Sequence, residues 1–315
     1  MPLLRRNQLW YPDVTKPKEP APHVTKPNLQ RAFQLDALSL GLFAAVCWGL
    51  HDILVRRVSQ NTPLMASLLM VLVAGTALQV IIMTSTGGFT QVPAPAAGYA
   101  ALSGVCFLLA SLGLYGAFQR GPVRLVAPII ASYPILSVGW AAASGTPISP
   151  IEWIAVLAII LGVSVVAMLS DDIDAEMPPK GRTIIYAVIA AIGFAGTFAI
   201  GQLATGMADD LPVILITRVL SIALLIGVML ALGLPFWPGR GALPVLALMG
   251  SLDGIALISV LSAGGLPDAQ YAAVASSVFG LLTVIMAWAF LKERMTTGQW
   301  SGVAVCFGGI GYLAL

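Results

Sequence analysis

The stretch SDDIDAEMPPK, residues 170–180, is the one markedly polar internal break in a chain made of apolar runs. Five runs precede it and five follow it, and each is close to the roughly twenty residues that span the hydrocarbon core of a bilayer. We therefore expect ten membrane-spanning helices, divided five and five by this break. The runs cover roughly residues 36–56, 63–84, 96–118, 122–143, 149–169, 183–205, 211–233, 242–264, 268–291 and 297–315.

The composition places the chain in the same class. Apolar residues make up 58% and charged residues 10%, whereas about 25% of the residues in an ordinary soluble domain are charged. The charges gather in the short breaks between runs, and a net charge of +2 is too small to indicate a nucleic-acid partner. The sequence thus predicts an all-α, multi-pass integral membrane protein whose surroundings are a lipid bilayer, most simply the inner (plasma) membrane.

The two halves are related by a shift of 147 residues, which places Trp153 on Trp300 and Gly162 on Gly309. We expect two five-helix repeats, at 35–169 and 182–315, joined by a polar linker at 170–181. Because each half has an odd number of spans, the second half enters the membrane from the opposite face. The prediction is an inverted five-plus-five repeat, an arrangement typical of secondary transporters.

Residues 1–34 are polar and rich in Pro and Lys and contain no apolar h-region, so we expect a disordered tail rather than a signal peptide. Cys47, Cys106 and Cys306 each lie inside an apolar run, without the spacing of metal ligands. We interpret them as buried reduced thiols. The sequence therefore predicts no metal site and no cofactor.

Several short motifs occur in a family-specific order. They are the segment Glu293 to Gly302, the pair Trp48-Gly49, the junction Tyr115 to Pro122 followed by Val126-Ala127-Pro128, and Arg218 within the seventh run. Together they resemble the EamA family of the drug/metabolite transporter superfamily, over residues 36 to 315. The resemblance implies a transporter of small metabolites, often an exporter of amino acids or similar compounds.

The chain also departs from that family pattern. Thr146 and Pro147 stand where the first half would carry its Glu-Arg pair, and Met70 and Val71 stand where the second run would carry an equivalent of Arg218. These departures weaken the expectation of a symmetric site. The resemblance does not fix the substrate.

Ionisable residues inside the runs need an explanation, because each costs about 2.5–3.5 kcal/mol on insertion scales. Asp52 precedes Arg56 by four residues, so the simplest interpretation is an ion pair between them on one face at the helix end. The alternative is that the Asp52 carboxylate binds a proton or a cationic group of the substrate. His51 points about 100° away from Asp52 and shares a face with Trp48. His51 and Trp48 either face a substrate cavity, where the imidazole could carry a proton, or the imidazole is hydrogen-bonded between helices.

Arg218 and Asp253 lie at similar depths in the seventh and eighth runs. A permanent cation at mid-depth requires an anion, a cage of carbonyl groups or water. The two side chains could form a structural ion pair across helices. Alternatively, Arg218 binds the carboxylate of a substrate.

The sixth run is rich in glycine between Gly193 and Gln202. Small residues allow helices to approach closely, and glycines also allow a helix to bend or unwind. Phe198 and Gln202, four residues apart, would face one cavity together.

The fourth run contains Pro128 and Pro134, which free backbone carbonyls and kink a helix. We expect the polar tips of Tyr115 and Tyr133 in the same cavity. The candidate substrate-binding residues are therefore Trp48, His51, Tyr115, Tyr133, Phe198, Gln202, Arg218 and Asp253.

Nothing in the spans predicts an enzyme. There is no Gly-x-x-x-x-Gly-Lys-Ser/Thr loop, so ATP is not the direct energy source, and no polar cluster suggests catalytic residues. For Glu293 and Arg294 we expect a solvated turn that caps the last helix.

The loop charges are strongly asymmetric. Breaks after even-numbered runs hold no Lys or Arg, while those after odd-numbered runs hold Arg56, Arg57, Arg120, Arg124, Lys180, Arg182, Arg240, Lys292 and Arg294. The positive-inside rule places the odd breaks in the cytoplasm and both termini outside. The basic residues of the tail and the family resemblance favour the opposite orientation.

The sequence thus predicts a secondary transporter that moves a small metabolite by alternating access, with proton coupling through His51 as one option. The alternatives are a membrane scaffold or sensor without transport, or an integral-membrane enzyme acting on lipid. The enzyme would need a catalytic or metal set near one interface, and the spans offer none.

Overall fold

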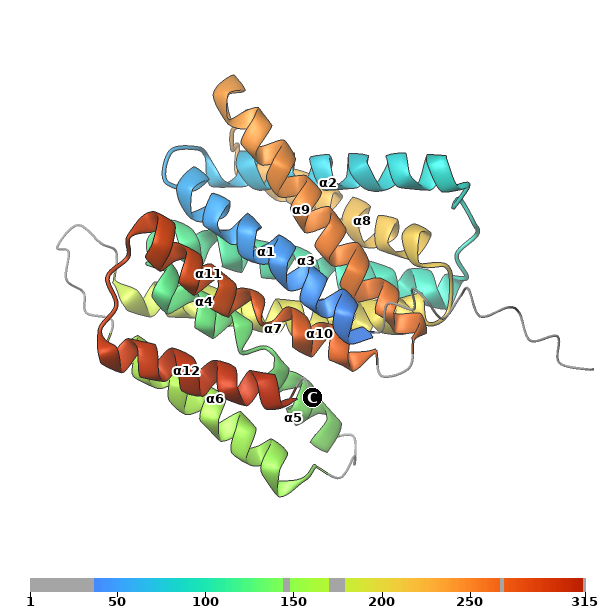
Figure 1. The fold of residues 1–315 in the computed structure, drawn as a ribbon. Helices are drawn as coiled ribbons and strands as arrows, with labels where there is room; N and C mark the ends of the chain where they lie inside the picture. The colour runs from blue at the N-terminus through green and yellow to red at the C-terminus, as the bar shows by residue number, and fades with distance from the viewer. Residues whose placement is uncertain (1–36, 144–147, 170–178, 267–268, 314–315) are drawn as a thin grey trace, which may run out of the picture. The chain divides into compact units, whose positions relative to one another are not determined.

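The computed structural model describes residues 37–143, 148–169, 179–266 and 269–313, and every regular element within them is helical. The elements are α1 (Ala37–Val58), α2 (Leu64–Thr86), α3 (Ala94–Arg120), α4 (Val123–Ala131), α5 (Pro134–Ala143), α6 (Pro150–Met168), α7 (Lys180–Thr205), α8 (Asp210–Ala231), η2 (Arg240–Ala242), α9 (Leu243–Ser262), η3 (Ala263–Gly265), α10 (Gln270–Ser276), α11 (Phe279–Met286), η4 (Ala287–Leu291) and α12 (Thr297–Leu313) (Figure 1). The predicted tail at 1–34 and most of the predicted linker at 170–181 lie outside the described residues.

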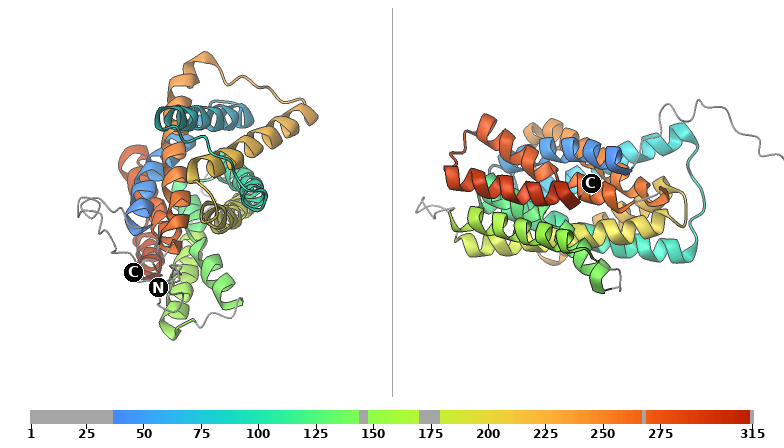
Figure 2. Two further views of the ribbon diagram at one scale, coloured as in Figure 1. Left: turned by 90° about the vertical axis from the view of Figure 1, so that its right-hand side faces the viewer. Right: turned by 60° about the horizontal axis from the view of Figure 1, so that its bottom comes forward.

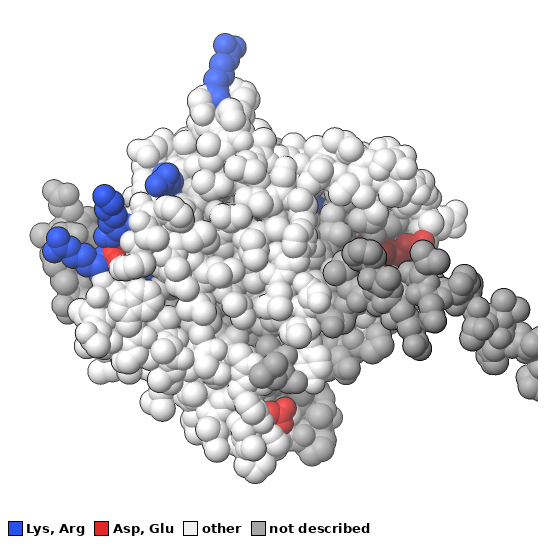
Figure 3. Space-filling model, in the orientation of Figure 1, with Lys and Arg blue, Asp and Glu red and all other residues white. Residues whose placement is uncertain are grey.

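Eight helical segments of the described chain are long and apolar enough to cross a membrane. The fourth predicted run is a shorter apolar helix, Val123–Leu136, and the tenth is α12, so ten transmembrane helices fit the structure. Large apolar side chains such as Phe43, Ile154 and Leu161 are exposed on the outer faces of the helices. On the face shown in Figure 3, charged side chains lie mostly toward the margins and the middle is uncharged. The chain is a multi-pass membrane protein.

Two of the predicted runs are interrupted near their middles. The fourth run stops at Ala131 and resumes at Pro134, because proline has no N–H for the helix ladder and its ring crowds the preceding turn. Pro128 lies inside α4 without ending it, so only one of the two prolines breaks the run.

The ninth run is interrupted at Ser277 and Val278, where no proline marks the break. The backbone N–H groups of Ser277 and Val278 bond to carbonyls three residues back, a tighter turn than the α-helix. The hydroxyls of Ser276 and Ser277 donate to the carbonyls of Ala273 and Val274 at 2.8 and 2.6 Å. Such side-chain bonds compete with the regular ladder.

The helices pack as two groups and a separate pair. In one group α9 packs against α1 and α2, and α1 also contacts α10 and α11; in the other, α3 packs against α7 and α8, and α4 contacts α7. Helices α6 and α12 pack side by side, as Figures 1 and 2 both show.

Small residues make the close helix contacts. A Cβ on Gly193 of α7 would lie 2.5 Å from the backbone nitrogen of Ala110 on α3, and one on Gly113 would lie 2.6 Å from the carbonyl of Tyr186. Close packing is therefore what the glycine-rich sixth run provides, and α7 stays helical throughout instead of unwinding.

Candidate functional site

A cavity lies between the two groups of helices, with side chains from α1, α2, α3, α7, α9 and α11 around it. The total empty volume between the lining atoms is about 430 Å³. Most of it is too narrow for a water molecule, and the remainder would hold only about one. The cavity is thus narrow in this conformation. It is lined by Trp48, His51, Asp52, Leu68, Val71, Leu72, Phe107, Ser111, Leu114, Tyr115, Phe194, Phe198, Asp253 and Phe279.

Five of the eight predicted binding residues line this cavity: Trp48, His51, Tyr115, Phe198 and Asp253. Their role as substrate ligands stays a prediction.

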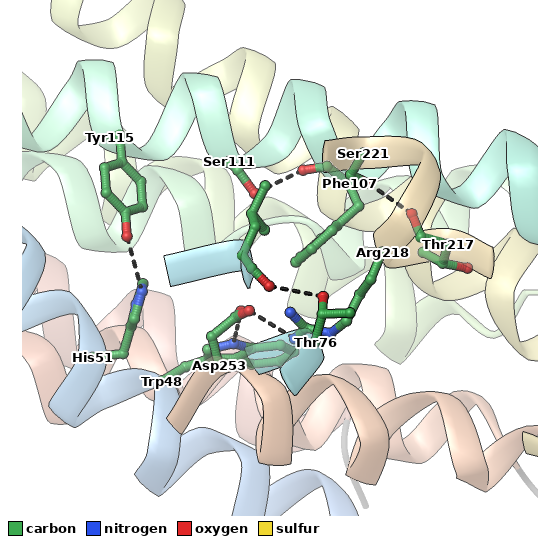
Figure 4. A network of polar contacts seen from close by, with 11 residues as sticks. Trp48, His51, Thr76, Phe107, Ser111, Tyr115, Thr217, Arg218, Ser221 and Asp253 are labelled. Atoms are coloured by element: carbon green, nitrogen blue, oxygen red, sulfur yellow. Dashed lines mark hydrogen bonds and ion pairs between the residues drawn. The ribbon is translucent and has the colours of Figure 1, made fainter. Parts of the chain in front are cut away.

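Arg218 and Asp253 form the ion pair that their depths suggested. Nη2 of Arg218 donates to Oδ2 of Asp253 at 2.8 Å, and the indole N–H of Trp48 donates to the other carboxylate oxygen at 3.2 Å (Figure 4). The Arg218 side chain is fully buried behind Asp253 and lies outside the cavity lining. Its guanidinium carbon is 5.5 Å from the centroid of the Phe107 ring.

A second polar chain crosses the cavity from α1 to α3. Nδ1 of His51 lies 3.1 Å from Oδ1 of Asp52. The hydroxyl of Tyr115 lies 3.4 Å from Nε2 of His51 (Figure 4). All three side chains are buried. The second oxygen of Asp52 is buried and has no hydrogen-bond partner.

The predicted ion pair between Asp52 and Arg56 is wrong. Arg56 donates instead to the backbone carbonyl of Phe118 at 2.7 Å. Asp52 turns inward toward His51. Adjacent positions on a helix are about 100° apart, but the flexible side chains of His51 and Asp52 bend toward each other over the cavity.

Aromatic rings form most of one wall of the cavity. The ring of Trp48 lies 6.1 Å from that of Phe194, 5.5 Å from that of Phe198 and 6.3 Å from that of Phe279. Phe194 and Phe198 stack at 5.7 Å. Phe194 was not predicted, although it precedes Phe198 by four residues and therefore shares its helix face.

Two predicted residues support the interrupted helices instead of lining the cavity. Tyr133 donates to the carbonyl of Ala273 at 2.6 Å, and its hydroxyl also lies 2.6 Å from the Ser276 hydroxyl. Gln202 donates to the carbonyls of Val260 and Ala269 at 3.0 and 2.9 Å. Neither side chain lines the cavity in this conformation, and their role as substrate ligands stays a prediction.

Glu293 caps a different helix from the one expected. Its carboxylate oxygens accept the backbone N–H groups of Val123 and Arg124 at 2.9 and 3.1 Å, at the start of α4. A carboxylate at this position satisfies free donors and complements the helix dipole. The last helix has its own cap, in which Thr296 and Gln299 exchange side-chain and backbone bonds.

The groups that line the cavity can bind a ligand. Within the described residues, no three His, Cys, Asp or Glu side chains come together as metal ligands. The cavity offers aromatic faces, an imidazole between a carboxylate and a phenol, and a carboxylate held by an arginine. Such a site suits a small organic molecule.

The apolar spanning helices around a small internal cavity define the class as multi-pass membrane proteins with a central binding site. Comparison with known families agrees: the model of the EamA-like transporter family matches residues 36–168 and again 181–315. The chain belongs to the EamA-like transporter family, within the drug/metabolite transporter superfamily.

A protein of known crystal structure superposes with a TM-score of 0.66, over 88% of this chain and 96% of its own. At 16% sequence identity this likeness concerns the fold alone. No match was found among curated proteins.

Proposed function

We propose that this protein is a secondary transporter that moves a small metabolite by alternating access, with the cavity between the helix groups as its substrate site. The observation that carries the proposal is a pair of hydrogen-bonded contacts between helices, here called closures, at opposite ends of the cavity. Alternating access requires two such closures that open in turn.

One closure joins α1 to α3 where both helices end. Arg56 donates to the carbonyl of Phe118 at 2.7 Å, and Gln60 donates to the carbonyl of Gln119 at 3.0 Å. Gln119 in turn donates to the carbonyl of Ser59 at 3.3 Å. These bonds link the two helix groups at one end of the cavity.

The other closure joins α7 to α9 and α10. Gln202 donates to the carbonyls of Val260 and Ala269, and Thr205 donates to the carbonyl of Leu261 at 2.6 Å. Gly264 lies directly against Thr205 and fits there because it has no side chain.

The two closures lie at opposite ends because α3 and α7 run antiparallel. Near the α7 closure, Ser103 donates to the carbonyl of Thr197 at 2.9 Å. At the other end of α3, Gly121 packs against Thr183, at the start of α7. The cavity residues of α3 lie between these two contacts.

The same contacts support an inverted repeat. The shift of 147 residues carries α1 onto α7 and α3 onto α9, so it exchanges the α1–α3 closure with the α7–α9 closure. The same shift relates α2 to α8. The packing of α3 against α7 and α8 therefore corresponds to the packing of α9 against α1 and α2. The interrupted fourth and ninth runs correspond in the same way.

Helices α6 and α12 add a symmetric detail. Gly162 packs against the carbonyl of Gly302, and Gly309 packs against the carbonyl of Ala155. The shift converts one contact into the other, which is what a two-fold axis between the helices would produce. The helix caps formed by Ser149 with Glu152 and by Thr296 with Gln299 also correspond.

The transport proposal is tested with purified full-length protein in liposomes, screened for uptake of amines, amino acids and other metabolites. Ser111 lines the cavity, and Ser251 lies away from it; both donate to the carbonyl four residues back, at 2.8 and 2.9 Å. Ser111→Phe should abolish uptake, and the matched control Ser251→Phe should keep it. A folded protein that moves no solute, or uptake unaffected by Ser111→Phe, would contradict the proposal.

A further inference from the structure

We propose that the cavity binds a monovalent organic ammonium ion that carries an aromatic or similar apolar group, with the Asp52 carboxylate as the ligand of the ammonium. This inference rests on the proposed transport function and names its substrate class. It follows from the charges, the hydrogen bonds and the aromatic rings of the cavity.

Within the described chain, the site contains one more buried carboxylate than permanent cations. Asp52 and Asp253 are buried carboxylates, and the permanent cation among their neighbours is Arg218. Buried charges are stable only when they are paired. Arg218 pairs with Asp253, which leaves Asp52 without a permanent cation in the part of the chain that the structure describes.

Both carboxylate oxygens of Asp253 already accept a hydrogen bond from the protein. Arg218 occupies one of its oxygens at 2.8 Å, and the indole N–H of Trp48 occupies the other at 3.2 Å. Asp52 differs, because Oδ1 lies 3.1 Å from His51 while Oδ2 is buried with no partner. Asp52 is 1% exposed and lines the cavity, so its free oxygen can accept a hydrogen bond from a ligand.

The surrounding rings favour a cation with a flat apolar part. Trp48, Phe194, Phe198 and Phe279 line the cavity close to one another. Aromatic faces attract ammonium groups, and they also provide apolar contact for an aromatic or aliphatic body.

An anionic group finds no matching partner in the cavity. Arg218 is fully buried behind Asp253, and its Nε and Nη1 have no hydrogen-bond partner among the described residues, but its side chain does not line the space. Both ring nitrogens of His51 are already engaged, with Asp52 and with Tyr115. The structure therefore disfavours the alternative that Arg218 binds a substrate carboxylate.

In the empty site a proton on the His51–Asp52 pair supplies the missing charge, and an arriving ammonium ion releases that proton to solution. The other titratable groups that face the pair are Tyr115 on α3 and Asp253 on α9, the latter paired with Arg218 on α8. Helices α2, α7 and α11 contribute only apolar lining side chains. Affinity should rise with pH, by up to about tenfold per pH unit while one proton is displaced.

The test uses four probes that share a phenyl ring: phenethylamine, phenylacetate, 2-phenylethanol and phenylalanine. Binding to the full-length protein in detergent is measured by thermal stabilisation and calorimetry between about pH 6 and pH 8, where the amine stays charged. Phenethylamine should bind most tightly and more tightly at the higher pH. Phenylalanine should bind at least about tenfold more weakly, because its carboxylate has no cation to meet.

Asp52→Asn should weaken phenethylamine binding by about tenfold to a hundredfold. The matched control is Asp209→Asn, which removes an exposed carboxylate before α8 and should change nothing. If Asp52→Asn does not fold, Phe198→Leu tests the binding site instead. This variant should weaken phenethylamine binding by about threefold to tenfold.

Tightest binding of phenethylamine, weakened by the cavity variants and rising with pH, supports the assignment. Equal or tighter binding of phenylacetate or phenylalanine overturns it, as does phenethylamine binding that the cavity variants or pH leave unchanged. A protein that transports other solutes but ignores phenethylamine overturns the substrate class and leaves the transport function standing. A protein that moves no solute at all overturns both.

Discussion

Nη2 of Arg218 lies 2.8 Å from Oδ2 of Asp253 in the interior of the membrane-spanning helices. This pair joins α8, which packs in one helix group, to α9, which packs in the other. It therefore holds a carboxylate at the cavity while linking the two groups across it. The pair explains how two ionisable residues are tolerated at this depth.

Removing one member of the pair should destabilise the protein. Asp253→Asn leaves Arg218 as an uncompensated buried cation, with an expected cost of about 3 kcal/mol. The double variant Arg218→Met with Asp253→Leu removes both charges and should recover part of that loss. Thermal unfolding in detergent measures both, and a double variant no more stable than the single one would contradict the pairing.

Gly75 on α2 should be intolerant of a side chain. A Cβ there would lie 2.7 Å from Nη1 of Arg218 and 2.6 Å from the carbonyl of Gly250. Gly75→Ala should cost about 1–3 kcal/mol through overpacking. The control is Gly98→Ala on α3, where a Cβ meets nothing within 4 Å; equal stability of the two variants would argue against this packing.

Weakening each closure should open the cavity toward one side only. A cysteine at Ser111, in a background without the three native cysteines, reports access of a membrane-impermeant thiol reagent. Gln202→Leu removes two bonds between α7 and the other group, and Arg56→Met removes a bond between α1 and α3. The two variants should raise labelling from opposite sides of the membrane; labelling from the same side would refute two separate closures.

Loss of the Glu293 cap should loosen the start of α4. Glu293→Ala removes the acceptor of two backbone N–H groups and should cost about 1 kcal/mol. Arg294→Ala, at an exposed neighbouring position, is the control and should have little effect. Thermal unfolding distinguishes them, and equal effects would show that the cap contributes nothing.

The sequence predicted what depends on composition and on the cost of buried charge. Apolar run lengths located the helices, and the depths of Arg218 and Asp253 suggested their ion pair. Proline marked the break in the fourth run. Each of these signals is contained in one segment, or follows from the need of a buried charge for a partner.

What the sequence could not provide depends on contacts between distant segments. The four-residue spacing predicts an ion pair between Asp52 and Arg56, because spacing considers only contacts within one helix. In the fold, Arg56 donates to a carbonyl of α3 instead. The break at Ser277 depends on serine bonds that compete with an otherwise regular pattern. Glu293 lies beside α12 in the sequence, and only the fold brings it to α4.

The central claim is that the cavity opens alternately at two closures. It is tested most directly by locking each closure in turn in transport-active liposomes with a short bifunctional thiol reagent. One pair of cysteines replaces Gln60 and Gln119, and the other replaces Gln202 and Ala269, which are hydrogen-bonded partners across each closure. Either cross-link should stop net transport, while single-cysteine variants treated alike should remain active. Undiminished transport with either closure fully cross-linked would contradict alternating access through this cavity.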